Sequence, residues 1–517
     1  MRQQTRREFL AEVGRGMIAS SVGFSLAAEL GLAPARADEA PRPLEFGPLE
    51  GLVRLMQETP IERLLPTLVG QLKSGIELRR LVAAAALANA RTFGGEDYVG
   101  FHTMMALAPA LHMAGELPAG LGPLPVLKVL YRNTNRIHEH GGRESEVLAQ
   151  VTPAPAGRLG PEALRDAIRH RDVKRAEETF ASLAGVSPDE ALNDAIFAVQ
   201  DDTEVHRTVL PYRSWDMLGL IGMEHAHTLL RQSVRYCLKA ESWGPSERRE
   251  QARELLPKLL DQYHLLGRTP GDRPADDKWI DEMSRNIFQS TPTQAAELVA
   301  AALADGIAPD SLGQAICLAA NQLILRDIGR TPADEVTGKP IGSVHGDSIG
   351  VHACDSANAW RNLARASNAR NSFACLILGA YQAALDRVNR GGDFLHWQPL
   401  PLPEHVRQIK QTDPAALVQD AEAAIRGNMQ AHACAIVHRY GELGHPARPV
   451  FDLLLKFAVS EDGSLHAEKF YRTVSEEFAS TRPAFRWRQL TALARVTASE
   501  YGRPAPGYAE ARDLLKV

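Results

Sequence analysis

The 517-residue sequence is poor in aromatic residues and lacks sustained alternation of β-branched and polar positions. Phe, Trp and Tyr make up only 6% of the chain. Strands are normally enriched in such residues, so few strands are expected. Apolar residues instead recur at helical spacing, as at Leu64, Leu65, Leu68 and Leu72. The sequence therefore predicts an all-α protein, a large multi-helix globular array.

Cysteine is also scarce. The five cysteines are scattered, and no two of them form a C-x-x-C pair. This distribution excludes a dense disulfide framework and a thiolate zinc site, and the lack of C-x-x-C-H excludes ordinary covalent c-type haem. The cysteines are expected to be small buried residues.

No excess of positive charge is present, and the formal net charge is −5. Nucleic-acid binding and a polybasic membrane patch are therefore not predicted. Among enzyme motifs, a P-loop, a G-x-S-x-G elbow, a G-x-G-x-x-G after a strand and H-E-x-x-H are all missing. The chain has none of the short signatures that would name a reaction directly.

The N-terminus has the order of features of an export signal. Arg6-Arg7 precedes Glu8-Phe9-Leu10, a weakly apolar stretch follows, and Ala35-Arg36-Ala37 fits a small-x-small cleavage site. We expect residues 1–37 to be a twin-arginine signal peptide read by the Tat translocase. The mature chain would then be periplasmic or otherwise extracytoplasmic, with no stable membrane span. Because the Tat route carries folded proteins, it raises the expectation of a cofactor inserted before export.

Two Pro- and Gly-rich stretches interrupt the helical pattern, at 152–160 and 266–277. The second predicts a division of the mature chain into an N-terminal helical subdomain, 38–265, and a C-terminal one, 278–517. A longer Gly-containing loop at 330–350 leads into a histidine-bearing helix, and loops of this kind often carry function.

Four histidines share a sequence context, near the N-terminal end of an apolar helix and after a polar or Gly-containing loop. They are His102, His225, His352 and His466. Helical bundles build metal sites from inward-facing residues on different helices, and imidazole is a common ligand of late first-row metals. The positive end of a helix also favours neutral imidazole, the form that binds metal. The four are therefore candidate metal ligands.

The metal that such a site would hold depends on what completes it. Histidine alone suits zinc or copper, whereas a mixed set with carboxylates suits iron or manganese. The candidate carboxylates are Asp97, Glu224, Asp347, Asp355 and Glu468. Lys469 and Arg361 are candidate catalytic residues that would bind an anionic substrate or stabilise developing negative charge. The competing interpretation is that the histidines are core residues bonded to backbone carbonyls.

Segments 86–112, 218–237, 351–367 and 465–478 together resemble a group of large, exported, all-helical proteins to which no reaction is assigned. The segment VHACDSANAWRNL, a histidine followed by an N-A-x-R pattern, also resembles questin oxidase-like proteins. That resemblance implies a helical fold and oxidative, Baeyer–Villiger-type ring opening of polyketides.

The expected function is that of an exported helical protein with a histidine-lined cleft, a metal-dependent oxidoreductase acting on a small organic substrate. Two alternatives stay open on the sequence. One is a non-catalytic helical scaffold or binding protein of the cell envelope, and the other is a metal carrier without turnover. The relative positions of the four histidines would separate these readings, because a shared site needs them to converge.

Overall fold

The computed structural model describes residues 42–154 and 160–517. The predicted signal peptide, residues 1–37, lies outside these ranges. Within them the chain forms 23 α-helices, three short 3₁₀ helices and a few isolated bridges, without a strand. The prediction of an all-α globular array is confirmed.

The first half of the chain contains α2 (Glu50–Glu58), α3 (Ile61–Lys73), α4 (Leu78–Phe93), α5 (Tyr98–Glu116), α6 (Pro123–His140), α7 (Pro161–Arg169), α8 (Val173–Ala184), α9 (Pro188–Val199), α10 (Val205–Ile221), α11 (Ala226–Glu241) and α12 (Glu247–Gln262). The second half contains α13 (Asp277–Gln289), α14 (Pro292–Ala304), α15 (Pro309–Arg326), α16 (Ile349–Ala366), α17 (Ala369–Arg390), α18 (Pro403–Gln408), α19 (Pro414–Arg426), α20 (Gln430–Glu442), α21 (Arg448–Ser460), α22 (His466–Ser480), α23 (Trp487–Glu500) and α24 (Tyr508–Leu515). The short 3₁₀ helices are η1 (Gly47–Leu49), η2 (Gly142–Ser145) and η3 (Met223–His225).

Local sequence explains where several helices begin. Asp97 caps α5 by accepting a hydrogen bond from the Gly100 backbone N–H at 2.7 Å, and Ser348 caps α16 in the same way. Thr291 forms a full capping box at the start of α14. Such caps satisfy amides that have no partner inside the helix. They fix the first turns of α5 and α16, which carry His102 and His352.

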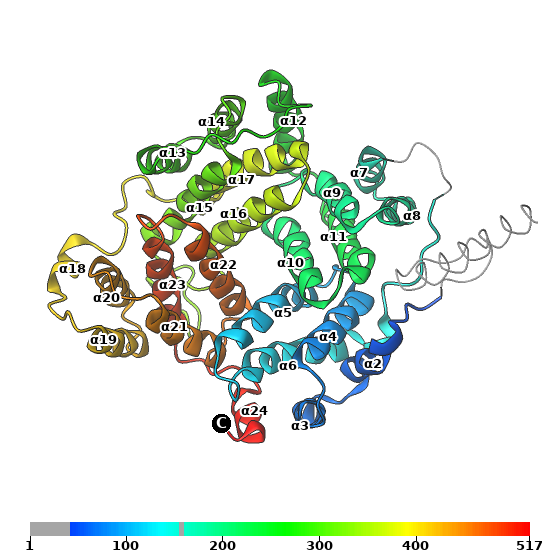
Figure 1. The fold of residues 1–517 in the computed structure, drawn as a ribbon, viewed down its shortest axis with the longest axis horizontal. Helices are drawn as coiled ribbons and strands as arrows, with labels where there is room; N and C mark the ends of the chain where they lie inside the picture. Colours follow the sequence, from blue (N-terminus) through cyan, green and yellow to red (C-terminus); the bar gives the residue numbers. More distant parts are fainter. Residues whose placement is uncertain (1–41, 155–159) are drawn as a thin grey trace, which may run out of the picture.

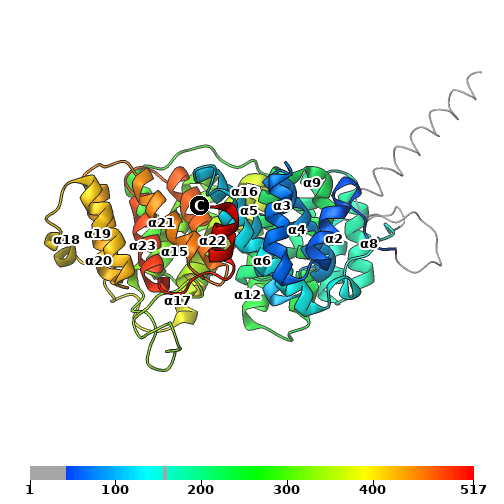
Figure 2. The same cartoon turned by 90° about the horizontal axis from the view of Figure 1, so that it is seen from below.

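Four helices border the middle of the array. Figure 1 shows α5, α10, α16 and α22 around the centre, and each packs against the next: α5 on α10, α10 on α16, α16 on α22 and α22 on α5. The array is elongated in the perpendicular view, where α2 and α8 lie at one end and α18 at the other (Figure 2). Segments more than 300 residues apart in sequence therefore meet at the centre.

The buried apolar side chains of both halves of the chain belong to one continuous core, from Leu44 to Ala511. The predicted division at 266–277 stays a prediction, since the central helices α5 and α10 pack on α16 and α22 across it. All five cysteines are buried and free, as expected. No helix in the described ranges is both long and apolar enough to cross a bilayer.

Candidate functional site

The four central helices each bring one histidine to the same place. His102 lies on α5, His206 on α10, His352 on α16 and His466 on α22, and each lies within the first five residues of its helix. We call these residues the histidine quartet. The N-terminal ends of four helices therefore converge on one point, although the four residues span positions 102 to 466 in the sequence.

The imidazole rings of the quartet form a closed four-sided arrangement. Successive ring centroids are 4.6 Å apart for His102 and His206, 5.9 Å for His206 and His352, 5.2 Å for His352 and His466, and 5.3 Å for His466 and His102. Two opposite sides also bring nitrogens into contact. The Nε2 atoms of His102 and His206 are 3.2 Å apart, and those of His352 and His466 are 3.1 Å apart.

Two backbone segments are shaped around His466: the turn just before α22 and the loop at 330–350. Ser464 and Leu465 immediately before it have positive φ values of 50° and 69°, which is uncommon for residues other than glycine. On the other side, a Cβ atom on Gly346 would lie 2.5 Å from the Cβ of His466. The glycine thus lets the loop at 330–350 close against the quartet, and the strained turn aims His466 at it.

Hydrogen bonds fix the tautomers of two quartet members. The Nδ1 of His102 lies 2.7 Å from the Tyr98 carbonyl oxygen, which can only accept, so this nitrogen carries the proton. The Nδ1 of His206 lies 2.6 Å from a carboxylate oxygen of Glu204. With both Nδ1 atoms donating, neutral rings would turn two Nε2 lone pairs toward each other at 3.2 Å. Only a cation relieves that contact: a proton, which makes His206 an imidazolium, or a metal ion bound by both nitrogens.

The other pair is less constrained. The Nδ1 of His466 is buried and has no hydrogen-bond partner among the described residues. An N–H on its Nε2 can therefore donate to the His352 Nε2, so the two facing nitrogens of these neutral rings are joined by a single hydrogen bond. The two sides of the quartet differ: the His102–His206 pair needs a cation between its nitrogens, and the His352–His466 pair does not.

Burial keeps three members of the quartet neutral. It lowers the pKa of His352 to about 3 and brings the pKa values of His102 and His466 well below the ordinary histidine range, with the positive charge of Lys469 acting in the same direction. Neutral imidazole is the form that can bind a metal or accept a proton. The site is therefore prepared for ligation at neutral pH.

Glu204 supports His206 as an ionised carboxylate. Burial alone would raise its pKa, but the charge of His206 and hydrogen bonds from His206, from the Tyr236 hydroxyl at 2.6 Å and from the Arg207 backbone N–H lower it to about 2. A carboxylate on the far nitrogen of an imidazole is the usual outer support of a metal-bound histidine. Tyr98 and Phe101 pack against His102 and His206 and cover this side.

Lys469, a predicted site residue, lies one helical turn beyond His466 on α22. It is 2% exposed, and burial lowers its pKa to about 8 while Asp355 and Glu468 oppose the shift. No carboxylate of the described residues comes within ion-pair distance of it, and it makes no hydrogen bond there. Its charge acts on His102, His352 and His466, so the sequence placed this residue correctly beside the quartet.

Two predicted residues lie elsewhere. His225 ends the short η3 helix that follows α10, and α10 extends about 22 Å from His206 to its last residue at a rise of about 1.5 Å per residue. Arg361 lies nine residues beyond His352 on α16, where it pairs with Glu477 at 2.6 Å and with Asp310 at 3.0 Å. The structure therefore brings His102, His352 and His466 together but neither His225 nor Arg361.

His206 takes the place that the sequence analysis gave to His225. Its context is the same as that of the other three, since it is the second residue of an apolar helix. Unlike His225, His352 and His466, it is not followed by alanine in the sequence. The Glu204 carboxylate two residues earlier, which caps α10, was the available signal.

The candidate carboxylates are engaged away from the metal-facing nitrogens. Three of them form ion pairs: Asp97 with Arg136, Asp347 with Arg330 and Lys339, and Glu468 with Lys128. Asp355 accepts a hydrogen bond from the Thr473 hydroxyl, and the Glu224 side chain is 54% exposed. In the described ranges no group of three or more His, Cys, Asp or Glu side chains is already arranged to hold a metal ion. The quartet stands as two close pairs rather than a closed coordination shell.

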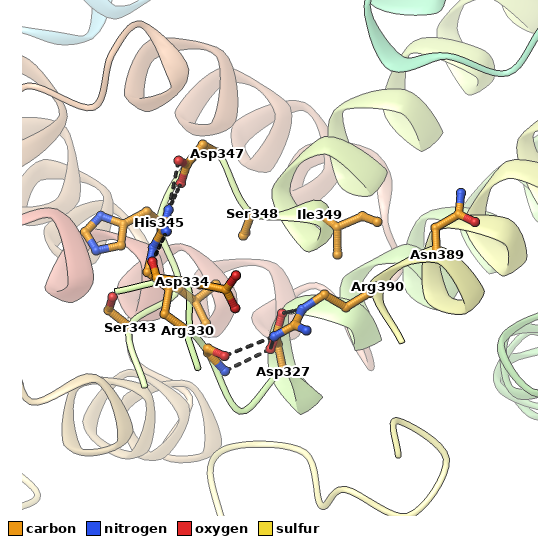
Figure 3. A pocket seen from close by; sticks show the side chains of 12 residues that line it. Asp327, Arg330, Asp334, Ser343, His345, Asp347, Ser348, Ile349, Asn389 and Arg390 are labelled. Carbon is orange, nitrogen blue, oxygen red and sulfur yellow. Dashed lines mark hydrogen bonds and ion pairs between the residues drawn. The ribbon is translucent and has the colours of Figure 1, made fainter. Parts of the chain in front are cut away.

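A cavity of about 360 Å³ lies beside the start of α16. Figure 3 shows its charged groups facing one another, Arg330 against Asp347 and Arg390 against Asp327. The quartet does not line it, but Ile349 in its wall is one turn from His352. Asp334 also lines the cavity, and its carboxylate accepts a hydrogen bond from the Thr331 hydroxyl.

Comparison with protein-family models, with curated proteins and with solved structures finds no match for this chain.

Proposed function

We propose that this protein is an exported metalloenzyme, an oxidoreductase of small organic substrates, in which His102, His206, His352 and His466 bind one transition-metal ion. The observation that carries the proposal is the closed arrangement of four imidazoles, one from each of four helices, with their Nε2 atoms facing inward in two pairs. Core histidines satisfied by backbone carbonyls would have no reason to meet in this way.

The distances support a shared ion. Two imidazoles bound to one metal at about 2.1 Å place their donor nitrogens about 3.0 Å apart at an octahedral angle and about 3.4 Å apart at a tetrahedral one. The observed separations of 3.2 and 3.1 Å lie between these two values. Drawing the two pairs together around one ion also relieves the facing lone pairs of His102 and His206.

The donor set favours copper among the four metals considered. Nitrogen ligands without a carboxylate suit copper or zinc better than iron or manganese. Zinc with four protein ligands is a closed structural site, whereas Cu(II) in a tetragonal nitrogen field accepts a further ligand. A site that both changes oxidation state and admits a substrate fits an oxidoreductase.

The chain's own residues have distinct tasks in this proposal. Glu204 and the Tyr98 carbonyl hold the Nδ1 protons of His206 and His102, which leaves the Nε2 lone pairs directed at the ion. The bound metal would supply the electron acceptor. His352 and Glu204 are half-buried and keep accessible surface. A small substrate would reach the quartet from the side on which these two side chains are accessible.

The test is elemental analysis of the mature protein, purified from a periplasmic fraction without an affinity tag. We expect about one equivalent of metal per chain in the wild type and none in His206→Ala. The matched control is His225→Ala, which removes a histidine of the same sequence type from the far end of α10. Circular dichroism establishes that both variants fold.

Reloading apoprotein with copper, zinc, iron or manganese then identifies the ion. A folded His206→Ala variant that retains wild-type metal would overturn the proposal. So would wild-type protein that neither contains metal nor gains thermal stability from any of the four. In that case the His102–His206 contact holds a proton, and the quartet is a buried acid–base group in a scaffold.

A further inference from the structure

Two lysines of the interior, each 2% exposed, have opposite surroundings. Lys128 donates to the carbonyls of Ala458 and Glu461 at 2.8 and 2.7 Å and pairs with Glu468 at 2.7 Å. Lys469 has no hydrogen-bond acceptor and no carboxylate within 4 Å among the described residues. A buried ammonium group loses its hydration, and leaving it without acceptors is costly. The Lys469 Nζ is not among the fully enclosed polar atoms that lack a partner, so it keeps a little accessible surface that an anion could contact.

The neighbouring acidic groups are not available to Lys469. The Asp355 carboxyl accepts a hydrogen bond from the Thr473 hydroxyl at 2.7 Å, and burial raises its pKa. Glu468 lies next to Lys469 in sequence but pairs with Lys128. The Glu204 carboxylate supports the quartet and is bonded to His206 and Tyr236. Asp355 and Glu468 oppose the lowering of the Lys469 pKa, but neither forms an ion pair with its ammonium group.

Helix ends add to the positive potential there. The quartet residues stand in the first turns of α5, α10, α16 and α22. Side chains cap the first three of these helices, whereas the N-terminus of α22, the helix that carries Lys469, has no side-chain cap. Helix N-termini favour anions and disfavour cations. A buried ammonium on the helix with the uncapped end therefore favours a bound anion.

We infer that the site binds an oxyanion beside the histidine quartet, with one oxygen accepting from the Lys469 ammonium. The anion is identified as the carboxylate or phenolate of the substrate, and this identification rests on the proposed function. The substrate class is then a small aromatic or aliphatic acid or phenol. An inorganic oxyanion shares the same recognition chemistry and is the other source to distinguish.

The experiment measures anion binding in metal-free and metal-loaded protein. Benzoate represents an organic carboxylate, and inorganic phosphate represents the other source. The readouts are isothermal titration calorimetry and the shift in melting temperature. Wild-type protein is compared with Lys469→Met, which keeps the length of the side chain and removes its charge, and with Lys469→Arg, which keeps the charge.

We expect Lys469→Met to weaken benzoate binding at least tenfold in both metal states, and Lys469→Arg to restore most of it. The matched control is Lys128→Arg, which alters the other buried lysine but keeps a cation for Glu468, and it should leave anion affinity unchanged. Binding of benzoate in preference to phosphate supports the substrate assignment. Binding of phosphate alone overturns that assignment and makes the anion inorganic.

Equal benzoate and phosphate affinities in wild type and Lys469→Met would overturn the oxyanion site itself. So would the absence of binding of both anions to wild-type protein. Because the metal-free arm does not depend on the quartet's ion, loss of metal binding with retained Lys469-dependent anion binding would refute the proposed function alone. Retained metal with no Lys469-dependent anion binding would refute this inference alone.

Discussion

Two groups of buried polar side chains occupy neighbouring parts of the array and differ in how completely their hydrogen bonds are satisfied. In the first, Glu241 on α11 accepts from Arg207 at 3.2 Å, from Arg249 at 2.9 Å and from Arg253 at 2.7 Å. We call these four residues the Glu241 network. In the second, the Nε2 atoms of His102 and His206 face each other, the His466 Nδ1 has no hydrogen-bond partner among the described residues, and Lys469 forms no ion pair there.

This difference distinguishes buried polar groups that stabilise the fold from buried polar groups that can bind a ligand. A buried charge that meets opposite charges on all sides holds helices in place and has no capacity left for a ligand. Buried groups without partners reduce stability, so they persist where a ligand completes them. The Glu241 network joins α10, α11 and α12, whereas the quartet joins four helix starts around an incomplete centre. Substitutions should therefore affect stability in the first group and ligand binding in the second.

The largest effect on stability is expected for Glu241→Ala. Removing this carboxylate leaves three buried guanidinium groups with less compensation, and breaking a buried pair typically costs about 3–5 kcal/mol. Urea unfolding followed by circular dichroism measures the loss. The control is Glu250→Ala, whose carboxylate is 60% exposed and pairs only with Arg253 in the described chain, and which should change stability by less than about 1 kcal/mol. Similar losses in the two variants would contradict the comparison.

A smaller effect, confined to ligand affinity, is expected for Tyr236→Phe. The substitution removes the hydroxyl that donates to Glu204 and so loosens the support of His206. Outer-shell partners of this kind are worth about 10- to 100-fold in metal affinity. Competition with a chelator measures the change, and Tyr381→Phe, whose hydroxyl donates to Gln251 on α12, is the control. Unchanged metal affinity in Tyr236→Phe would separate Glu204 from the metal site.

An effect that depends on pH is expected for Asp386→Asn. Burial raises the pKa of Asp386 to about 8 from an ordinary value of 3.8. The folded protein therefore holds this proton between about pH 4 and 8 while the unfolded chain releases it, so this group lowers stability as pH rises through that range. Asparagine carries no charge, and the variant should gain melting temperature over wild type as pH increases from 4 to 8. A pH-independent difference would contradict this assignment.

Much of the fold could be predicted from the sequence. Helical spacing of leucines, helix caps such as Ser348 and Asp97, and glycines at helix ends are local signals, because each acts within a few residues. The same local reasoning found three members of the quartet, since a histidine in the first turn of an apolar helix faces the interior. It also placed Lys469, because a residue three positions after His466 shares its helix face.

The errors arose where the local signal was ambiguous. His225 and His206 have similar contexts, and only the packing of α10 against α5 and α16 decides which of them reaches the centre. Arg361 shares a helix with His352, but Glu477 and Asp310 from other helices meet its guanidinium first. In both cases the partner is distant in sequence, and no pattern within one helix indicates it.

The sequence alone determined that this chain folds as an array of helices and that several of them begin with a buried histidine, because helix formation, capping and amphipathic faces depend on residues a few positions apart. Tertiary structure decided that α5, α10, α16 and α22 meet at their N-terminal ends. It also decided that Lys128 is neutralised while Lys469 is not. Those outcomes depend on contacts between residues hundreds of positions apart, whose distances only the packed chain sets.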